Sequence, residues 1–216
     1  MLDIENIKEE WNKYLDARDT GIKHVWKPLL SKQLEEIKSL NKEDLNDYLL
    51  EICKLHFDVG LNIPVEHPNI WPQILELWKC KLDNPDEKIF LWLFKAKLYK
   101  DACLLCSGEP KELLESALTI NPESKEAKKL LFIENLDLLD FAMHSLPCGL
   151  HLEVDTCKSA ISECEQMLVK NPELKIYKTR FNIGFSHYKE MFFAWLEYQE
   201  KGIKLEFFDW YKPTET

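Results

Sequence analysis

The sequence predicts an all-α protein, and three observations lead to that prediction. Apolar residues recur at helical spacing along most of the 216 residues, 45% of the chain is hydrophobic, and it contains only six glycines. Six glycines are too few for the turns of an all-β fold, and a chain of this length hides roughly 70% of its unfolded surface on folding. We therefore expect about nine helices around a sizeable core, arranged as stacked helical hairpins behind an N-terminal helical unit.

The first 62 residues predict that N-terminal unit, with three helices. An apolar stripe over residues 3–18 favours an amphipathic helix, which Asp3 can cap and Gly21 ends. A second pattern covers residues 25–40, with Pro28 near its first turn. Asn41 can cap a third helix that ends near Gly60. The stripe residues are Ile4, Ile7, Trp11, Tyr14 and Leu15, then Val25, Trp26, Leu29, Leu30, Leu34, Ile37 and Leu40, then Leu45, Tyr48, Leu49, Ile52 and Phe57.

A proline-rich loop follows this unit. Pro64, Pro68 and Pro72 fall between residues 60 and 72, and Pro72 suits the first turn of the next helix. We expect a boundary here, with residues 63–216 forming a second region of helical hairpins, unless the whole chain is one continuous domain. The helical patterns of this region cover residues 70–83, 86–106, 110–120, 123–146, 156–170 and 173–201. The aromatic tail at residues 205–211 is expected to pack on the last helix.

One short motif occurs three times in the second region. Asn-Pro, an acidic residue, a variable residue and Lys follow one another at residues 84–88, 121–125 and 171–175, with separations of 37 and 50 residues. Asn can end one helix or cap the next, Pro has the φ of a first helical position, and an early acid faces the positive end of the helix dipole. The motif therefore indicates pairs of helices joined by short linkers.

This repeat resembles the tetratricopeptide family of helix-turn-helix repeats over residues 70–200. In that family a Pro closes the second helix of each repeat, with small residues five and about twelve positions before it. Ala117 lies five positions before Pro122, and Ala160 lies twelve before Pro172. The positions five before the other two prolines hold Cys80 and Met167, the first-helix Trp, Leu-Gly and Tyr positions are largely absent, and residues 144–155 form an insertion. The resemblance implies stacked helix pairs with a groove that binds a peptide or protein; a non-repeating helical bundle is the alternative fold.

The charge of the chain is acidic and unevenly distributed. Its 28 Lys and Arg, of which only Arg18 and Arg180 are arginines, stand against 38 Asp and Glu, for a net charge of −10. Phosphate neutralisation supplies most nucleic-acid affinity, so this balance argues against nucleic acid and favours a basic protein partner. Two windows without basic residues form either solvated helix faces or an electronegative docking surface. Their acids are Asp58, Glu66 and Glu76 in residues 55–78, and Glu134, Asp137, Asp140, Glu153 and Asp155 in residues 130–157.

Aromatic residues near the end of the chain are further candidates for contact. Trp195, Trp210 and Tyr211 suit either packing of the C-terminal segment or an interface anchor. The favoured function is a non-enzymatic, cofactor-free module that binds a basic protein through an acidic and aromatic face. Its most specific form is a bacterial immunity protein or antitoxin that blocks a cationic toxin, and a second form is a scaffold that binds through an apolar groove.

Each of the two arginines is followed by a histidine, which suggests an enzymatic alternative. Arg18 precedes His24, and Arg180 precedes His187. The spacing resembles the Arg-x(4 to 6)-His motif of the HEPN family of helical ribonucleases, and this resemblance implies that the pair would polarise a phosphate and handle a proton. On one continuous helix Arg180 and His187 would share a face. The polar residue that follows Arg in the family is present as Asp19 but replaced by Phe181.

The seven cysteines are expected to be reduced. Cys53, Cys80 and Cys164 lie among apolar neighbours, which favours buried thiols. The remaining soft ligands do not form the two close pairs typical of a structural zinc site, so no metal is expected. These ligands are Cys103, Cys106, His144, Cys148, His151 and Cys157.

The amino terminus predicts neither a signal peptide nor a membrane span. Residues 1–8 are charged and lack an apolar stretch, and no window of the chain reaches the length of a membrane span. A cytoplasmic protein without membrane contact is therefore expected.

Overall fold

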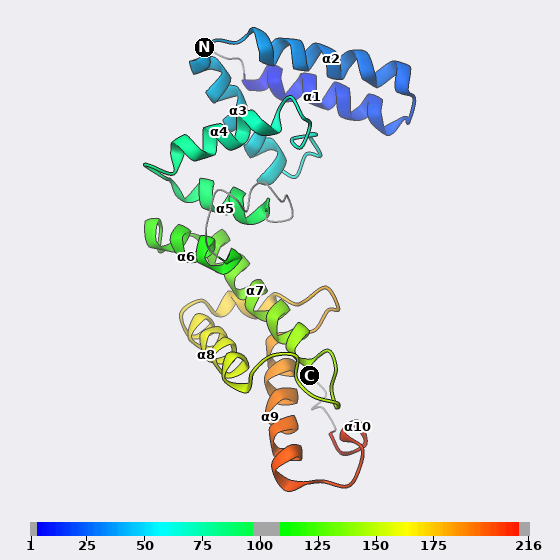
Figure 1. The fold of residues 1–216 in the computed structure, drawn as a ribbon, viewed down its shortest axis with the longest axis vertical. Coiled ribbons are helices and arrows are strands. Elements are labelled where there is room, and N and C mark those ends of the chain that lie inside the picture. Colours follow the sequence, from blue (N-terminus) through cyan, green and yellow to red (C-terminus); the bar gives the residue numbers. More distant parts are fainter. Residues whose placement is uncertain (1–3, 97–108, 212–216) are drawn as a thin grey trace. The chain divides into compact units, whose positions relative to one another are not determined.

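A computed structural model describes residues 4–96 and 109–211 of the protein. Over these ranges it consists of ten α-helices and one 3-10 helix without any strand, which confirms the predicted all-α fold of about nine helices (Figure 1). The helices are α1 (Ile4–Asp19), α2 (Lys23–Ser39), α3 (Lys42–Phe57), α4 (Trp71–Lys81), α5 (Glu87–Lys95), α6 (Pro110–Ile120), α7 (Lys125–Met143), α8 (Val154–Lys170), the 3-10 helix η2 (Pro172–Ile176), α9 (Phe185–Lys201) and α10 (Phe207–Trp210). The Asp3 cap and most of the predicted helical segment after Ala96 lie outside the described residues.

The chain forms two compact units, residues 1–120 and 121–216. The division coincides with the second Asn-Pro motif, at Asn121, and not with the proline-rich loop. Helix α3 packs against both α4 and α5, so the loop between α3 and α4 joins helices of one unit. The boundary expected at residues 62 and 63 therefore lies inside the first unit.

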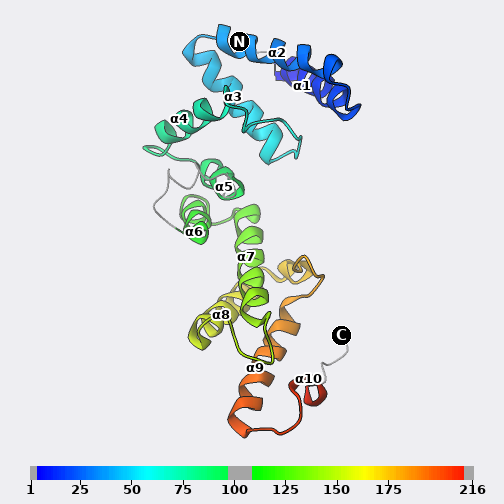
Figure 2. The ribbon, with the colours of Figure 1, turned by 45° about the vertical axis from the view of Figure 1, so that its right-hand side comes forward.

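Consecutive helices of the first unit pack as pairs. Helix α1 contacts α2, α3 contacts α4, and α5 contacts α6, while α3 also contacts both α1 and α5. Figures 1 and 2 show α1 and α2 side by side as an antiparallel hairpin. The predicted stripes of α1 and α3 are largely buried, with Trp11 and Ile52 fully enclosed. The stripe of α2 is less buried than predicted, because Ile37 reaches the core whereas Val25 is 41% exposed.

A buried chain of hydrogen bonds joins the first three helices. The indole Nε1–H of Trp11 donates to the Tyr48 hydroxyl at 3.0 Å, and that hydroxyl donates to Oε1 of Gln33 at 3.1 Å. Gln33 is only 2% exposed, because it lies within the apolar stripe of α2, four residues after Leu29 and four before Ile37. Burial raises the pKa of Tyr48, so its hydroxyl stays protonated and remains a donor. One polar group from each of α1, α2 and α3 is thereby satisfied inside the core.

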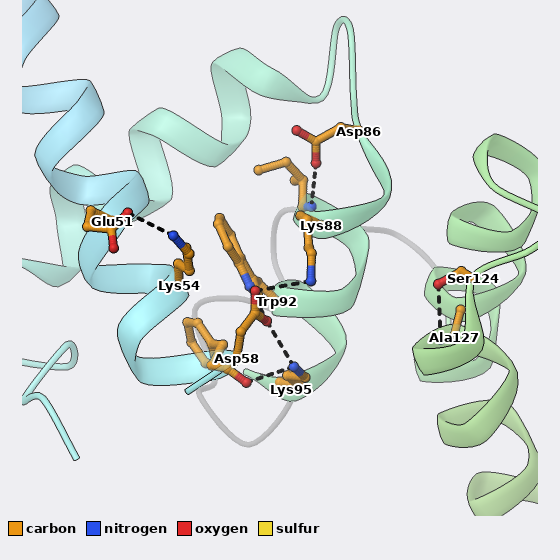
Figure 3. Close-up of polar contacts among 11 residues, drawn as sticks. Glu51, Lys54, Asp58, Asp86, Lys88, Trp92, Lys95, Ser124 and Ala127 are labelled. Carbon is orange, nitrogen blue, oxygen red and sulfur yellow. Dashed lines mark hydrogen bonds and ion pairs between the residues drawn. The ribbon is translucent and has the colours of Figure 1, made fainter. Parts of the chain in front are cut away.

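The helix caps agree with the sequence prediction at one position and differ at two. Asn41 caps α3 as predicted, and its side chain accepts from the backbone N–H groups of Glu43 and Asp44. At the first two Asn-Pro motifs, however, the cap follows the proline. Asp86 accepts from the N–H of Ile89, and Ser124 accepts from the N–H of Ala127 (Figure 3). The short side chains after the proline reach the exposed N–H groups of the first turn, so α5 and α7 begin later than the motif suggests.

The second unit packs α8 and α9 against α7. Its core consists of one apolar cluster: Phe132, Leu136, Leu139, Ala142, Met143, Leu146, Cys157, Ala160, Ile161, Cys164, Leu174, Phe185, Tyr188, Phe192 and Phe207. The buried alanines at positions 142 and 160 leave room for the larger side chains of the neighbouring helices. Helix α7 contacts both α8 and α9, and Figures 1 and 2 show the three together.

The prediction of one continuous helix over residues 173–201 is wrong for the residues before Phe185. Residues Pro172–Ile176 form the 3-10 helix η2, and α9 begins only at Phe185. Between them a tight turn is closed by a bridge between Lys178 and Gly184, and by a backbone hydrogen bond of 2.9 Å from Thr179 N–H to the Ile183 carbonyl. Asn182 has φ of 63° within this turn, a left-handed conformation that interrupts a right-handed helix and that Asn tolerates better than most residues.

Candidate functional site

Asp58, the first candidate docking acid, lies at the centre of a polar cluster inside the first unit (Figure 3). Its Oδ1 accepts from Nε1–H of Trp92 at 3.0 Å and contacts Nζ of Lys95 at 3.1 Å, and its Oδ2 contacts Nζ of Lys88 at 3.1 Å. Burial disfavours the carboxylate, but the hydrogen bonds from Trp92, Lys88 and Lys95 outweigh that effect and lower the pKa of Asp58. Asp58 therefore joins α3 to α5 and is not an open docking acid.

The other two acids of the first window are exposed and stand apart from that cluster. Glu66 lies in the loop between α3 and α4, and Glu76 lies on α4 with its carboxylate 3.9 Å from the Cys80 sulfur. Cys80 is exposed, so the expectation of a buried thiol is wrong at this position, whereas Cys53 and Cys164 are buried as expected. Residue 80 lies about 200° around the helix from the buried Trp78 and so faces water.

Three acids of the second window lie along α7. Glu134 and Asp140 are half-buried and Asp137 is exposed. Asp140 accepts a hydrogen bond of 2.7 Å from the Tyr188 hydroxyl, and that hydroxyl lies 3.1 Å from the hydroxyl of the buried Thr179. Burial, with the neighbouring Asp140, raises the pKa of Tyr188, so the hydroxyl stays a donor to the carboxylate. Asp140 thus joins α7 to α9 through its hydrogen bond with Tyr188.

The last two acids of that window lie where α8 begins. Glu153 is the exposed N-cap residue of α8, and its side chain accepts no capping hydrogen bond. Asp155 is exposed in the first turn and lies 3.7 Å from Nζ of Lys158. Both positions suit an acid, because carboxylates in the first turn face the positive end of the helix dipole.

A half-open pocket of about 490 Å³ contains two of the predicted docking acids. We call it the α7 pocket; its lining residues are Ile133, Asp137, Asp140, Phe141, His144, Lys178 and Arg180. Phe141, in the last turn of α7, is 56% exposed, which is unusual for a phenylalanine. Its ring stacks on His151 at 5.2 Å between centroids, and His151 in turn lies 2.6 Å from the Ser145 hydroxyl. The loop after α7 therefore holds the Phe141 ring in place at the pocket rim.

Arg180 and His187 do not share a helix face, contrary to the expectation from their spacing. Arg180 lies in the turn before α9 with its guanidinium 4.7 Å from the centre of the Phe181 ring, whereas His187 lies in the first turn of α9. The helix starts between these two residues, so their seven-residue spacing does not place the two side chains on one helix face. The two side chains also line different pockets. The other pair is likewise divided, because Arg18 ends α1 and donates to the Asn62 carbonyl, whereas His24 is exposed on α2.

The second pocket, of about 390 Å³, lies where α9 begins. We call it the α9 pocket; its lining residues are Leu168, Lys175, Lys178, Asn182, Ile183, Gly184, Phe185, Ser186 and His187. Lys178 lines both pockets. Lys178 was not among the predicted site residues, because the segment around it was expected to be a regular helix.

The aromatic residues of the tail pack back on the second unit, one of the two alternatives left open by the sequence. Tyr211 stacks on Phe207 with 5.4 Å between ring centres, and Trp210 lies 5.9 Å from the ring of Tyr198. Trp195, Trp210 and Tyr211 are all half-buried against the apolar cluster. Burial, with Glu190 nearby, raises the pKa of Tyr211. The more exposed aromatic side chain here is Phe208, at 57%.

The soft ligands considered for a metal do not gather within the described ranges. No group of three or more His, Cys, Asp or Glu side chains there could hold a metal ion. His144 and His151 are stacked with 6.3 Å between ring centres, Cys148 is exposed and Cys157 is buried. Cys103 and Cys106 lie outside the described residues.

Comparison with protein-family models, with curated proteins and with solved structures finds no match for this chain. Its function must therefore be inferred from the chemistry of its own residues. Among the described helices, none is both long enough and apolar enough to cross a bilayer.

Proposed function

We propose that this protein is a binding module whose protein partner docks at the α7 pocket. The observation that carries the proposal is that the pocket unites Asp137 and Asp140 with the half-exposed ring of Phe141. Carboxylates attract a lysine or arginine side chain, and an aromatic face adds a cation–π contact. A basic residue of a partner could contact a carboxylate and the aromatic face at once.

The residues on the other side of the same pocket restrict the charges that a partner segment can carry. Lys178 and Arg180 line it as well, so a uniformly basic segment would meet like charges there. A partner segment with one basic residue toward Asp137 and one acidic residue toward Arg180 fits both halves. The exposed acids Glu66, Glu76 and Glu153 contribute to the negative field that draws a basic protein to the surface.

The packing of the helices supports the proposed likeness to tetratricopeptide repeats. Each Asn-Pro motif follows the second helix of a packed pair. The pairs are α3 with α4, α5 with α6, and α7 with α8. Ala117 and Ala160, at two of the small-residue positions, are buried. Proteins built from such pairs hold peptides or proteins on an extended surface. The most specific form of the proposal is an immunity protein or antitoxin, and co-purification with the product of a neighbouring toxin gene tests that form.

The paired change Asp137→Asn and Phe141→Ala is expected to reduce the amount of partner retained by about tenfold, because it removes a charge and the aromatic contact together. The measurement is affinity capture from extracts of the source cells by the tagged full-length protein, with the retained partner quantified at low and at high salt. Retention by the unaltered protein should fall as salt rises, since contacts between charges are screened.

A matched control uses Asp209→Asn with Phe208→Ala, which removes the same groups from α10. Both residues are exposed there and neither lines the α7 pocket. Equal losses with the two double variants would contradict docking at the α7 pocket. Retention independent of salt would contradict its electrostatic part.

The ribonuclease alternative requires RNA cleavage, which the proposed binding module does not perform. We expect RNA incubated with the purified protein to remain intact, and the His187→Ala variant to give the same result, because Arg180 and His187 line separate pockets. Gel analysis of labelled RNA over time measures this. Cleavage by the unaltered protein that disappears in His187→Ala would instead establish the enzyme.

A further inference from the structure

The segment between α8 and α9 is basic, although the protein as a whole is acidic. Between the two helices, residues 171–184 contain Lys175, Lys178 and Arg180 against a single acid, Glu173. A local excess of positive charge in a chain of net charge −10 indicates a surface that attracts anions.

The two lysines at the α9 pocket have no ion pair in the part of the chain that the structure describes, in contrast to several other lysines of the second unit. Lys158, Lys189 and Lys201 of the same unit each pair with an acid. Neither Lys175 nor Lys178 pairs with an acid within residues 4–96 and 109–211. Two ammonium groups that line one pocket without a counter-charge are a favourable place for an anion.

The lining of the α9 pocket contains hydrogen-bond donors and no carboxylate. Besides the two lysines it presents the Ser186 hydroxyl, the Asn182 amide and the His187 ring. Its apolar side is formed by Leu168, Ile183 and Phe185. The α7 pocket differs in this respect, since Asp137 and Asp140 line it. Only the α9 pocket of these two therefore matches a ligand that is purely anionic at one end and apolar at the other.

The backbone holds these donors in place without a ligand. The bridge between Lys178 and Gly184 and the hydrogen bond from Asn182 N–H to the Thr179 carbonyl close the turn, and the buried Thr179 side chain contacts Tyr188. Gly184 is the N-cap of the 17-residue helix α9, and no side chain accepts from the first N–H groups of that helix. Those N–H groups add to the donors that the side chains supply.

We propose that the α9 pocket binds the phosphate group of a small phosphorylated molecule. The charge of a phosphate dianion matches Lys175 and Lys178, its oxygens accept from Ser186, Asn182 and the first turn of α9, and the rest of the molecule rests on the apolar side. The volume of about 390 Å³ falls in the range of about 300–1,000 Å³ typical of small-molecule pockets. This proposal does not depend on the docking function proposed for the α7 pocket, although Lys178 lines both pockets.

The test is calorimetric titration of the full-length protein with phenyl phosphate and, separately, with inorganic phosphate at low salt. Saturable binding of phenyl phosphate is expected, weakened about tenfold or more by the paired change Lys175→Gln and Lys178→Gln. Amide NMR shifts of Gly184, Ser186 and His187 should move on titration. Tighter binding of phenyl phosphate than of inorganic phosphate supports a phosphorylated molecule, and equal binding supports the free ion as the source of the phosphate.

The matched control is Lys170→Gln with Lys204→Gln, which removes the same charge from two exposed lysines that do not line the pocket. It should bind phenyl phosphate as the unaltered protein does. Equal weakening in both double variants, or no saturable binding of either probe, would overturn the proposal. Binding of an RNA oligomer through Lys175 and Lys178, without binding of phenyl phosphate, would overturn it in favour of RNA. Circular dichroism of each variant reports whether the fold is retained.

Discussion

Replacing Tyr48 with Phe is expected to lower the free energy of unfolding of the first unit by about 2–4 kcal/mol, because it removes one hydroxyl on which two buried groups depend. The Trp11 indole N–H loses its acceptor and the Gln33 carbonyl loses its donor. Neither can turn to water, since Trp11 is fully enclosed and Gln33 is 2% exposed. A buried polar group without a partner costs about 1–3 kcal/mol, and here two arise together.

Urea denaturation followed by circular dichroism measures this loss. Tyr14→Phe is the matched control, because Tyr14 is a buried tyrosine of the same unit with no hydroxyl hydrogen bond within the described ranges. Adding Gln33→Leu to Tyr48→Phe should recover part of the stability, since the orphaned carbonyl is then removed. Similar losses for Tyr14→Phe and Tyr48→Phe would show that the hydrogen-bond chain contributes little.

Replacing Asp58 with Ala is expected to cost about 2–3 kcal/mol, because one carboxylate satisfies three donors. Without it the Trp92 indole N–H, in a side chain only 5% exposed, loses its acceptor, and Lys88 and Lys95 each lose an ion pair. The Asn variant keeps an acceptor for Trp92 and should lose less. Thermal denaturation of both variants gives the comparison, and equal losses would contradict the role assigned to the indole bond.

The same carboxylate predicts a pH dependence. The folded state lowers the pKa of Asp58, so its contribution is fully present above the pKa of the unfolded chain, about 3.9, and is lost as the pH falls through the lower folded value. The gap in unfolding free energy between the unaltered protein and Asp58→Asn should therefore be widest near neutral pH and narrow below about pH 4. Denaturation series at several pH values measure the gap, and a constant gap would contradict the prediction.

The helices themselves could be predicted from the sequence because their signals are local. Apolar spacing and terminal glycines gave α1 and α3 nearly to the residue, and Gly21 and Gly60 adopt the positive φ expected where a helix ends. The break before α9 was not predicted from the sequence, because the apolar pattern continues without interruption from Lys175 to Gly184. It depends on the bridge between Lys178 and Gly184, which joins residues that a helix would have separated by more than one turn.

The candidate site was predictable only in part, because charge in a sequence does not show what faces it. Asp58 looked like a free acid in a window without lysines, yet Lys88 and Lys95 reach it from α5. Gln33 is a polar residue within the apolar stripe of α2, and its partner Tyr48 comes from another helix, which the sequence does not reveal. Phe141 could have been suspected, because it is a large apolar residue one position after Asp140, on the polar side of α7. Such pairings arise only when separate helices pack.

The position of Lys178 between two pockets links them thermodynamically. A ligand that holds its ammonium group on the α9 side withdraws positive charge from the α7 side, where Asp137 and Asp140 lie. The affinity of the α7 pocket for a basic side chain then rises. Coupling of this kind is reciprocal, so a basic partner at α7 strengthens anion binding at α9 by the same factor. If both proposals hold, the single Lys178 side chain would couple binding at one pocket to binding at the other.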